Sequence, residues 1–241
     1  MKQVRIMVLS KRKIKRNLFI ILFSFIGLYL LISLYFINHF LFRTEINGVN
    51  VSLKAHRNFS NIISKYIREY DILIIERSGE TEVITGHEIG MKYNNGISLH
   101  RIWCIQNPFM WLSSLFKSSK FYIKDLFIYN AELLDIRINR LNCLNREIIN
   151  PRNVDFKYIN GSYEIIKEID GNKINKFYLK KALIKYISEG KRILDLDKMN
   201  CYEKPKYTAS SKKTIKTKNL LDKYVSAKIT YRFGKDTETL D

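Results

Sequence analysis

Residues 18–41 read LFIILFSFIGLYLLISLYFINHFL and contain no Lys, Arg, Asp or Glu. At about 1.5 Å per residue in a helix, roughly twenty apolar residues cross a hydrocarbon core about 30 Å thick. His39 lies near the C-terminal end of the stretch, where water and lipid headgroups can solvate it. The stretch therefore predicts a transmembrane helix over residues 18–41.

The segment before this stretch, residues 1–17, is basic and contains no acidic residue. Its positive charges are Lys2, Arg5, Lys11, Arg12, Lys13, Lys15 and Arg16. Such clusters are retained on the cytoplasmic side of a membrane. We therefore expect a cytoplasmic N-terminal tail, with everything after about Phe42 on the other side of the cell membrane.

Three other interpretations of the apolar stretch fit less well. A cleaved signal peptide has an apolar region of about 7–15 residues followed by a small-residue cleavage site. Here the run is longer, and residues 36–40 (FINHF) lack an A-x-A pattern. A lipoprotein needs a Cys directly after the run, but the first Cys is Cys104. A buried core helix is rarely so uniformly apolar. We expect an uncleaved single-pass anchor.

The chain of 241 residues carries a net charge of +19, of which the tail supplies seven, leaving +12 for the remainder. A content of 46% hydrophobic and 13% aromatic residues is enough for a folded core. A basic exported region favours anionic partners such as wall polymers or anionic lipids. Its Lys and Arg residues are scattered rather than gathered between aromatic residues, so we do not expect nucleic-acid binding.

The pattern after the anchor predicts the α+β fold class, with two small α+β units and an incomplete third. Residues 42–125 form the first unit and a connector. Apolar residues at helical spacing, from Phe59 to Tyr70, predict an amphipathic helix. Strands are predicted at 72–75 and 82–85, separated by a Ser78-Gly79 turn, and Asn47-Gly48 predicts an earlier turn.

Residues 97–129 are rich in aromatic side chains without a single period, and Pro108 interrupts any helix there. One interpretation is an exposed aromatic surface that stacks on sugar rings. The other, which we favour, is a connecting segment packed between the two units.

Residues 126–241 form the second unit and the beginning of a third. The patterns predict helices over 130–140 and 179–187, a hairpin turning at Asn160-Gly161, and a strand over 193–196. A basic loop over 206–214 precedes a helix near 220–224 and a strand over 229–233. We expect this last strand to be an edge with few partners, as in a chain that is cut short.

The three cysteines are the candidate reactive residues of the chain. Disulfides form outside a bacterial cytoplasm, and Cys143 and Cys201 both follow predicted elements of one unit. They are the candidate disulfide, which would close a loop of about 58 residues. The alternative is three free, buried thiols. Cys104 would in either case be left over and buried between its apolar neighbours.

No catalytic, cofactor-binding or metal-ligating set is predicted. A nucleophilic Cys needs a nearby base and oxyanion donors, and no Cys here has a neighbouring His, Arg or Gly. His56, His87 and His100 share no metal-ligand spacing. Asp195 and Asp197 alternate with apolar residues on a strand, and we expect both to face solvent.

Several runs of sequence resemble one family. They are INGVNVS (46–52), VITGHEIGMKY (83–93), QNPFMW (106–111), INPRNVDFKYINGSYEIIKEIDG (149–171) and ILDLDKMNCYEKP (193–205). Together they resemble the YoaR-like peptidoglycan-binding domain, which precedes the catalytic domain of Gram-positive membrane-anchored L,D-transpeptidases. The resemblance covers nearly all of the region after the anchor, and its motifs are structural rather than catalytic. It implies that residues 126–241 are the YoaR-like peptidoglycan-binding domain, truncated at its C-terminus.

The resemblance implies an extracytoplasmic protein whose partner is peptidoglycan or another anionic wall polymer. The catalytic domain of that family carries an H-x-x-x-H-G segment and an S-x-G-C-x-R nucleophile motif, and neither occurs here. We therefore expect a binding protein and no enzyme. The alternatives are the N-terminal portion of an L,D-transpeptidase, because ITYRFGKDTETLD (229–241) resembles the passage toward the catalytic part, and a spacer that binds no ligand.

The predicted topology is testable with a protease that cannot cross membranes. Added to intact cells or right-side-out vesicles, it should digest the region after residue 42 and leave the membrane-spanning stretch protected. Immunoblots against tags at the two ends measure this. Protection of the C-terminal tag would contradict the predicted orientation.

Overall fold

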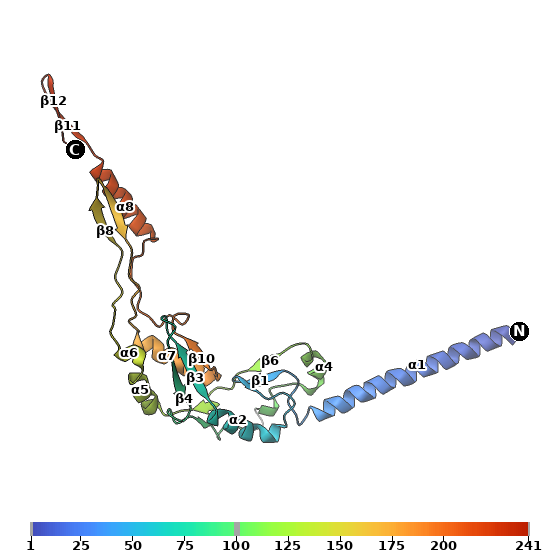
Figure 1. The fold of residues 1–241 in the computed structure, drawn as a ribbon. Helices are drawn as coiled ribbons and strands as arrows, with labels where there is room; N and C mark the ends of the chain where they lie inside the picture. Colours follow the sequence, from blue (N-terminus) through green and yellow to red (C-terminus); the bar gives the residue numbers. More distant parts are fainter. Residues whose placement is uncertain (1, 99–101, 241) are drawn as a thin grey trace. The chain divides into compact units, whose positions relative to one another are not determined.

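A computed structural model describes residues 2–98 and 102–240 of the chain. Its mixture of helices and small separate sheets confirms the α+β class. The described residues form two compact units, each assembled from three stretches of the chain (Figure 1). The first comprises residues 1–72, 84–134 and 185–192, and the second 73–83, 135–184 and 193–241. The predicted domain boundary at residue 125 stays a prediction.

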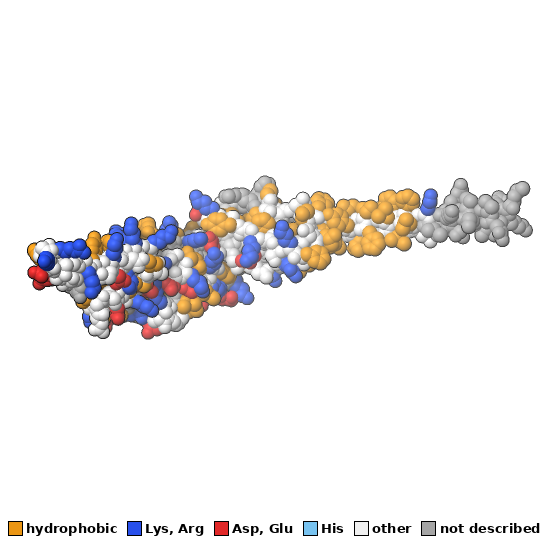
Figure 2. Space-filling model, turned by 90° about the horizontal axis from the view of Figure 1, so that it is seen from above, with side chains coloured by type: hydrophobic (Ala, Val, Ile, Leu, Met, Phe, Trp, Pro, Cys, Tyr) orange, Lys and Arg blue, Asp and Glu red, His pale blue; other side chains and the backbone are white. Residues whose placement is uncertain are grey.

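Helix α1 (Lys2–Tyr35) contains residues 18–35 of the predicted membrane-spanning stretch. Its segment Lys15–Tyr35 is long and apolar enough to cross a membrane, with a mean hydropathy of 2.5. Figure 2 shows hydrophobic side chains gathered along the part of α1 whose side chains are described. The predicted C-terminal limit of the span was wrong: α1 ends at Tyr35, and Phe36, Phe40 and Leu41 are buried in the core of the first unit. Apolarity alone does not distinguish residues that face lipid from residues that enter a protein core.

The rest of the first unit is built around short strands and helix α2. Its elements are β1 (Thr44–Ile46), β2 (Val49–Asn50), η1 (His56–Asn58), α2 (Phe59–Arg68), β5 (Lys92–Tyr93), η2 (Pro108–Met110), α4 (Trp111–Ser114), β6 (Ser119–Phe121) and β7 (Phe127–Ile128). β1 pairs antiparallel with β2 and parallel with β6. The predicted stripe of α2 is confirmed as core, since Phe59 and Ile63 are fully buried.

The aromatic connector differs from the interpretation that we favoured. Its large side chains are mostly exposed rather than packed: Trp103, Phe109, Met110, Leu112, Phe116 and Tyr122. Asn107 caps the short helix η2 by accepting a hydrogen bond from the Phe109 N–H (3.0 Å), and Pro108 occupies the first helical position. The absence of one period reflects two short helical turns followed by a strand.

The second unit contains a three-stranded sheet in the order β10-β3-β4, from β10 (Ile193–Asp195), β3 (Asp71–Ile75) and β4 (Thr81–Thr85). β10 runs parallel to β3. Its helices are α5 (Ala131–Asn139), α6 (Asn142–Asn145) and α7 (Lys176–Glu189). β3, β4, α5 and α7 also contribute residues to the first unit. Buried residues of this core include Ile74, Leu183 and Leu194.

The remaining elements are two hairpins and a helix, and they complete the second unit: β8 (Asp155–Ile159), β9 (Ser162–Ile166), α8 (Lys212–Val225), β11 (Ile229–Phe233) and β12 (Asp236–Leu240). The predicted hairpin is confirmed, with Asn160 and Gly161 at positive φ in its turn. α8 lies along this hairpin (Figure 1), and its Asp222 accepts a hydrogen bond from the Tyr163 N–H (3.1 Å).

Two details at this end of the chain were predicted wrongly. α8 begins at Lys212, inside the predicted loop, because Ser211 caps it by accepting from the Thr214 N–H. β11 is not left without a partner, since β12 pairs with it antiparallel along its whole length. The polar run Thr237-Glu238-Thr239 carries no apolar alternation, so the sequence pattern did not reveal this strand.

Candidate ligand-binding groove

The carboxamide of Asn47 joins three segments of the first unit. It donates to the carbonyl oxygens of Ile123 (3.0 Å) and Ser188 (2.8 Å), and it accepts from the Ile123 N–H (2.8 Å). The side chain is buried, and its partners lie 76 and 141 positions away in the sequence. Because buried polar groups need partners, this residue fixes how the three segments approach one another.

Two glycines allow the segments to meet. Gly190 has a φ of +65°, and a Cβ there would lie 2.0 Å from the carbonyl oxygen of Asn47. Gly48 has a φ of +76°, and its Cβ would lie 2.8 Å from the carbonyl oxygen of Gly190. Both the backbone conformation and the space therefore require glycine. The hydroxyls of Tyr66 and Tyr70 hold the same turn by donating to the carbonyls of Gly190 and Lys191.

A groove of about 290 Å³ opens beside this junction, and we call it the Asn47 groove. Its lining residues are Glu45, Asn47, Gly48, Lys120, Phe121, Tyr122, Glu189 and Lys191. They come from β1 and the turn after it, from β6, and from the end of α7, all within the first unit. The groove therefore exists only where the Asn47 junction has formed.

The charges of the Asn47 groove alternate in sign. Lys120 Nζ lies 3.5 Å from Glu45, and Lys191 Nζ lies 2.6 Å from Glu189. The hydrogen bond to the Glu189 carboxylate raises the pKa of Lys191. Tyr122 is 57% exposed beside these pairs. A groove lined by an exposed aromatic ring together with ammonium and carboxylate groups can contact both the apolar and the charged parts of a ligand.

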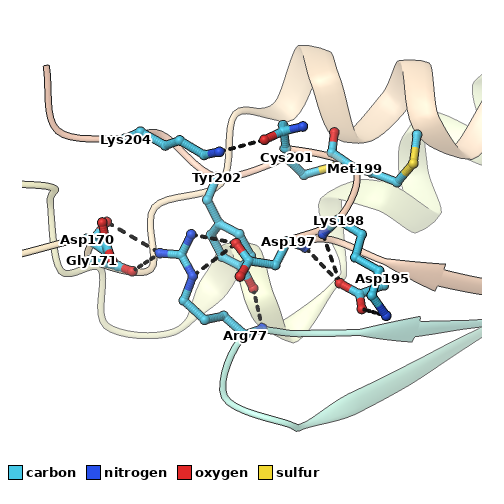
Figure 3. A network of polar contacts seen from close by, with 11 residues as sticks. Arg77, Asp170, Gly171, Asp195, Asp197, Lys198, Met199, Cys201, Tyr202 and Lys204 are labelled. Atoms are coloured by element: carbon cyan, nitrogen blue, oxygen red, sulfur yellow. Dashed lines mark hydrogen bonds and ion pairs between the residues drawn. The ribbon is translucent and has the colours of Figure 1, made fainter.

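The second unit holds a separate polar network around Arg77 (Figure 3). Its guanidinium lies 2.7 Å from Asp197, donates to the Gly171 carbonyl oxygen (2.8 Å), and stacks over the Tyr202 ring at 4.2 Å. Asp195 is half-buried and pairs with Lys198 (2.8 Å), whose side-chain hydrogen bond lowers the pKa of this carboxyl. Asp195 and Asp197, which were predicted to face solvent, are therefore both ion-paired. The network stabilises the loop after β10.

A carboxylate cluster of the same unit surrounds Arg146. Its guanidinium pairs with the buried Glu76 and with Glu80, and the three residues line a cavity of about 460 Å³ together with Glu82. Glu76, Glu82 and Cys143 place ligand atoms within 4.8 Å of one another. Arg146 already neutralises Glu76, and burial raises the pKa of the Cys143 thiol, so this cluster has the chemistry of a structural ion pair.

One comparison with known proteins bears on function. Residues 107–195 match the family described as "Putative peptidoglycan binding domain". The match includes Lys120, Tyr122 and Glu189 of the Asn47 groove. No curated protein and no solved structure matches the chain. Peptidoglycan consists of sugar rings with charged peptide stems.

The cysteines do not form an activated site in the described residues. Cys143 and Cys201 are buried thiols, and burial raises the pKa of Cys143 to about 12 and that of Cys201 to about 11. Such thiols stay protonated and unreactive. Cys104 is exposed, so the expectation that it is buried was wrong. The pairing of Cys143 with Cys201 stays a prediction.

The three histidines considered as ligands lie in different surroundings. His56 is buried, and burial, together with nearby His39, lowers its pKa. His87 is exposed in the turn after β4. His100 lies outside the described residues.

Sequence reasoning missed the groove residues themselves. Glu45, Lys120 and Tyr122 belong to no recognisable motif, and Glu189 and Lys191 flank a glycine that reads as a helix end. The available signal was Asn47-Gly48, which predicted only a turn. Nothing in the sequence states that the amide of this turn binds chain segments far away.

We predict that Asn47→Gly destabilises the protein by roughly 2–4 kcal/mol, because it removes the hydrogen-bond partner of the Ile123 N–H and of the Ser188 carbonyl oxygen. Glycine adopts the positive φ of residue 47 without strain, so the substitution measures the contribution of the Asn47 side chain and not a change in backbone conformation. Urea unfolding of the full chain in detergent micelles, followed by Trp fluorescence, measures the loss. Asn160→Gly is the matched control, since Asn160 is exposed at a similar φ in a turn, and it should change stability by less than about 0.5 kcal/mol. Equal effects would contradict the role of the Asn47 amide.

A second prediction concerns the thiols. A thiol-specific reagent should label Cys104 in the native protein and leave Cys143 and Cys201 unlabelled, because these two are buried and protonated. Mass spectrometry of labelled peptides identifies the sites. The number of thiols labelled after unfolding without reductant tests the predicted Cys143–Cys201 disulfide. Three labelled thiols exclude the disulfide, and labelling of Cys104 alone demonstrates it. Rapid native labelling of Cys143 would contradict the burial.

Proposed function

We propose that this chain is a single-pass membrane protein, with a cytoplasmic N-terminus, that displays a peptidoglycan-binding module to the cell wall. The observation that carries the proposal is the family match over residues 107–195, combined with an apolar helix before it that is long enough to span a membrane. We further propose that the module binds without catalysing a reaction, since the matched family is one of binding domains.

The orientation follows from charge. The basic residues precede the apolar stretch of α1, and Lys15 and Arg16 stand directly at its beginning. Retention of these charges on the cytoplasmic side directs the remaining chain outward. Peptidoglycan lies outside the membrane, so this orientation brings the module to its ligand.

The proposal extends to a relation with the YoaR-like domain of Gram-positive L,D-transpeptidases. It is supported by runs of similar sequence that reach beyond the matched segment on both sides, from residue 46 to residue 205. One of these runs begins with the Asn47-Gly48 turn, which builds the groove.

We place ligand binding in the Asn47 groove. Tyr122 offers a ring face to a sugar, Lys120 and Lys191 can meet peptide carboxylates, and Glu45 and Glu189 can meet the amino group of a stem peptide. Because each charge already has a partner of opposite sign, a ligand that carries both charges can replace both partners without leaving a charge unpaired.

Retention of the full chain, in detergent micelles, on purified peptidoglycan tests this function. We predict that Tyr122→Ala weakens retention roughly two- to twelvefold, through the loss of about 0.5–1.5 kcal/mol of ring contact. Lys120→Ala should weaken it as well. Tyr122 and Lys120 are exposed, so neither change should disturb the fold.

Matched controls are Tyr224→Ala and Lys223→Ala on the exposed surface of α8, which alter the same side-chain types in the second unit. They should leave retention unchanged. If the control variants lose as much retention on peptidoglycan as the groove variants do, the Asn47 groove is not the binding site. Retention no better than that of an unrelated basic protein at matched salt would contradict wall binding and favour a spacer, because nonspecific charge attraction is screened.

A further inference from the structure

Two short helices of the aromatic connector, η2 and α4, contact α1 within the first unit. The hydroxyl of Tyr29 donates to the carbonyl oxygen of Phe109 (2.6 Å), and the Tyr29 and Trp111 rings lie 5.7 Å apart. Phe109 belongs to η2 and Trp111 begins α4. Both helical turns therefore touch the helix that the proposed function places in the membrane.

The contact lies well inside the apolar span. Tyr29 precedes Tyr35, the last residue of α1, by six positions, which is about 9 Å along a helix axis. The span Lys15–Tyr35 is about as long as the hydrocarbon core is thick, roughly 30 Å. With α1 in a bilayer, η2 and α4 reach the level of the acyl chains rather than the headgroups.

The surface that this segment presents is apolar. Phe109, Met110 and Leu112 are each more than half exposed, and Phe116 is 81% exposed. Large apolar side chains gathered on one short segment are costly in water, at about 25 cal/mol per Å² of exposed apolar area. Lipid contact removes this cost.

At the beginning of the segment, backbone polar groups have internal partners, as lipid requires of them. Pro108 has no N–H, the Phe109 N–H donates to the Asn107 side chain (3.0 Å), and the Met110 N–H donates to the Asn107 carbonyl oxygen (2.9 Å). The Ser114 hydroxyl donates to the Trp111 carbonyl oxygen (2.7 Å). The Tyr29 hydroxyl, which α1 would otherwise carry into hydrocarbon unpaired, is satisfied by the same segment.

The charges on both sides agree with a membrane surface. From residue 102 to residue 124 the sequence contains no Asp or Glu, whereas Lys117 and Lys124 follow the apolar side chains. Lysines at this position can meet lipid phosphates while the apolar residues before them enter the bilayer.

We propose that residues 107–116 insert into the leaflet at the C-terminal end of α1, with acyl chains covering Phe109, Met110, Leu112 and Phe116. This inference rests on the proposed membrane anchor. It gives the first unit a second attachment to the membrane, which limits how far the module can tilt or turn about α1. The Asn47 groove begins only four residues later, at Lys120, so its height above the membrane is fixed by the same insertion.

The two native Trp residues, Trp103 and Trp111, make the chain suitable for fluorescence quenching. A background with Trp103→Phe and Trp111→Phe then receives one Trp at a time in the full chain, reconstituted into phosphatidylcholine vesicles. Lipids brominated on their acyl chains quench Trp in the bilayer, and aqueous iodide quenches Trp in water. Phe116→Trp is the test, Leu31→Trp on α1 is the positive control, and Phe177→Trp in the second unit is the negative control.

We expect Phe116→Trp and Leu31→Trp each to lose about half of their emission with brominated lipid and to resist iodide, as residues within the hydrocarbon core do. Phe177→Trp should show the reverse. Quenching of Phe116→Trp by iodide alone, with Leu31→Trp still quenched by lipid, would overturn the insertion and leave the anchor intact. Resistance of Leu31→Trp to brominated lipid would overturn the anchor and the insertion together.

Discussion

The buried carboxamide of Asn47 is the interaction on which the first unit depends. It binds the backbone of the segments after β6 and at the end of α7, and it does so from a turn at positive φ that Asn tolerates better than most residues. Gly48 and Gly190 give the backbones the room to approach. Asn47, Gly48 and Gly190 thus position the walls of the Asn47 groove, which come from three distant parts of the chain.

The Asn47 groove lies close in sequence to the apolar residues 107–116. β6, which carries Lys120 and Phe121, follows directly after the apolar turns that contact α1 at Tyr29. A wall-binding surface close to its own membrane contact would be held at a defined height, where it can meet newly made peptidoglycan.

The second unit uses charge differently. Arg77 and Arg146 each pair with carboxylates, and Arg77 also holds the backbone carbonyl of Gly171 and the ring of Tyr202. Breaking such a partly buried pair is costly because it leaves an uncompensated charge. These arginines stabilise loops around β3 and β10, and they explain why acidic residues that look solvated in the sequence have fixed partners in the fold.

The sequence by itself determined the apolar stretch of α1 that is long enough to span a membrane, the α+β class, and the positions of α2, α7 and the β8–β9 hairpin, because each depends on local periodicity or turn chemistry. It did not determine where α1 ends, because Phe36 and Phe40 are as apolar in a protein core as in lipid. Nor did it reveal β12, whose polar residues gain their strand only by pairing with β11. Only the tertiary structure decided that Glu45, Tyr122 and Glu189 line one groove, and that the connector lies against α1. Those contacts join residues tens of positions apart, and no local pattern specifies which distant backbone a buried amide or hydroxyl will bind.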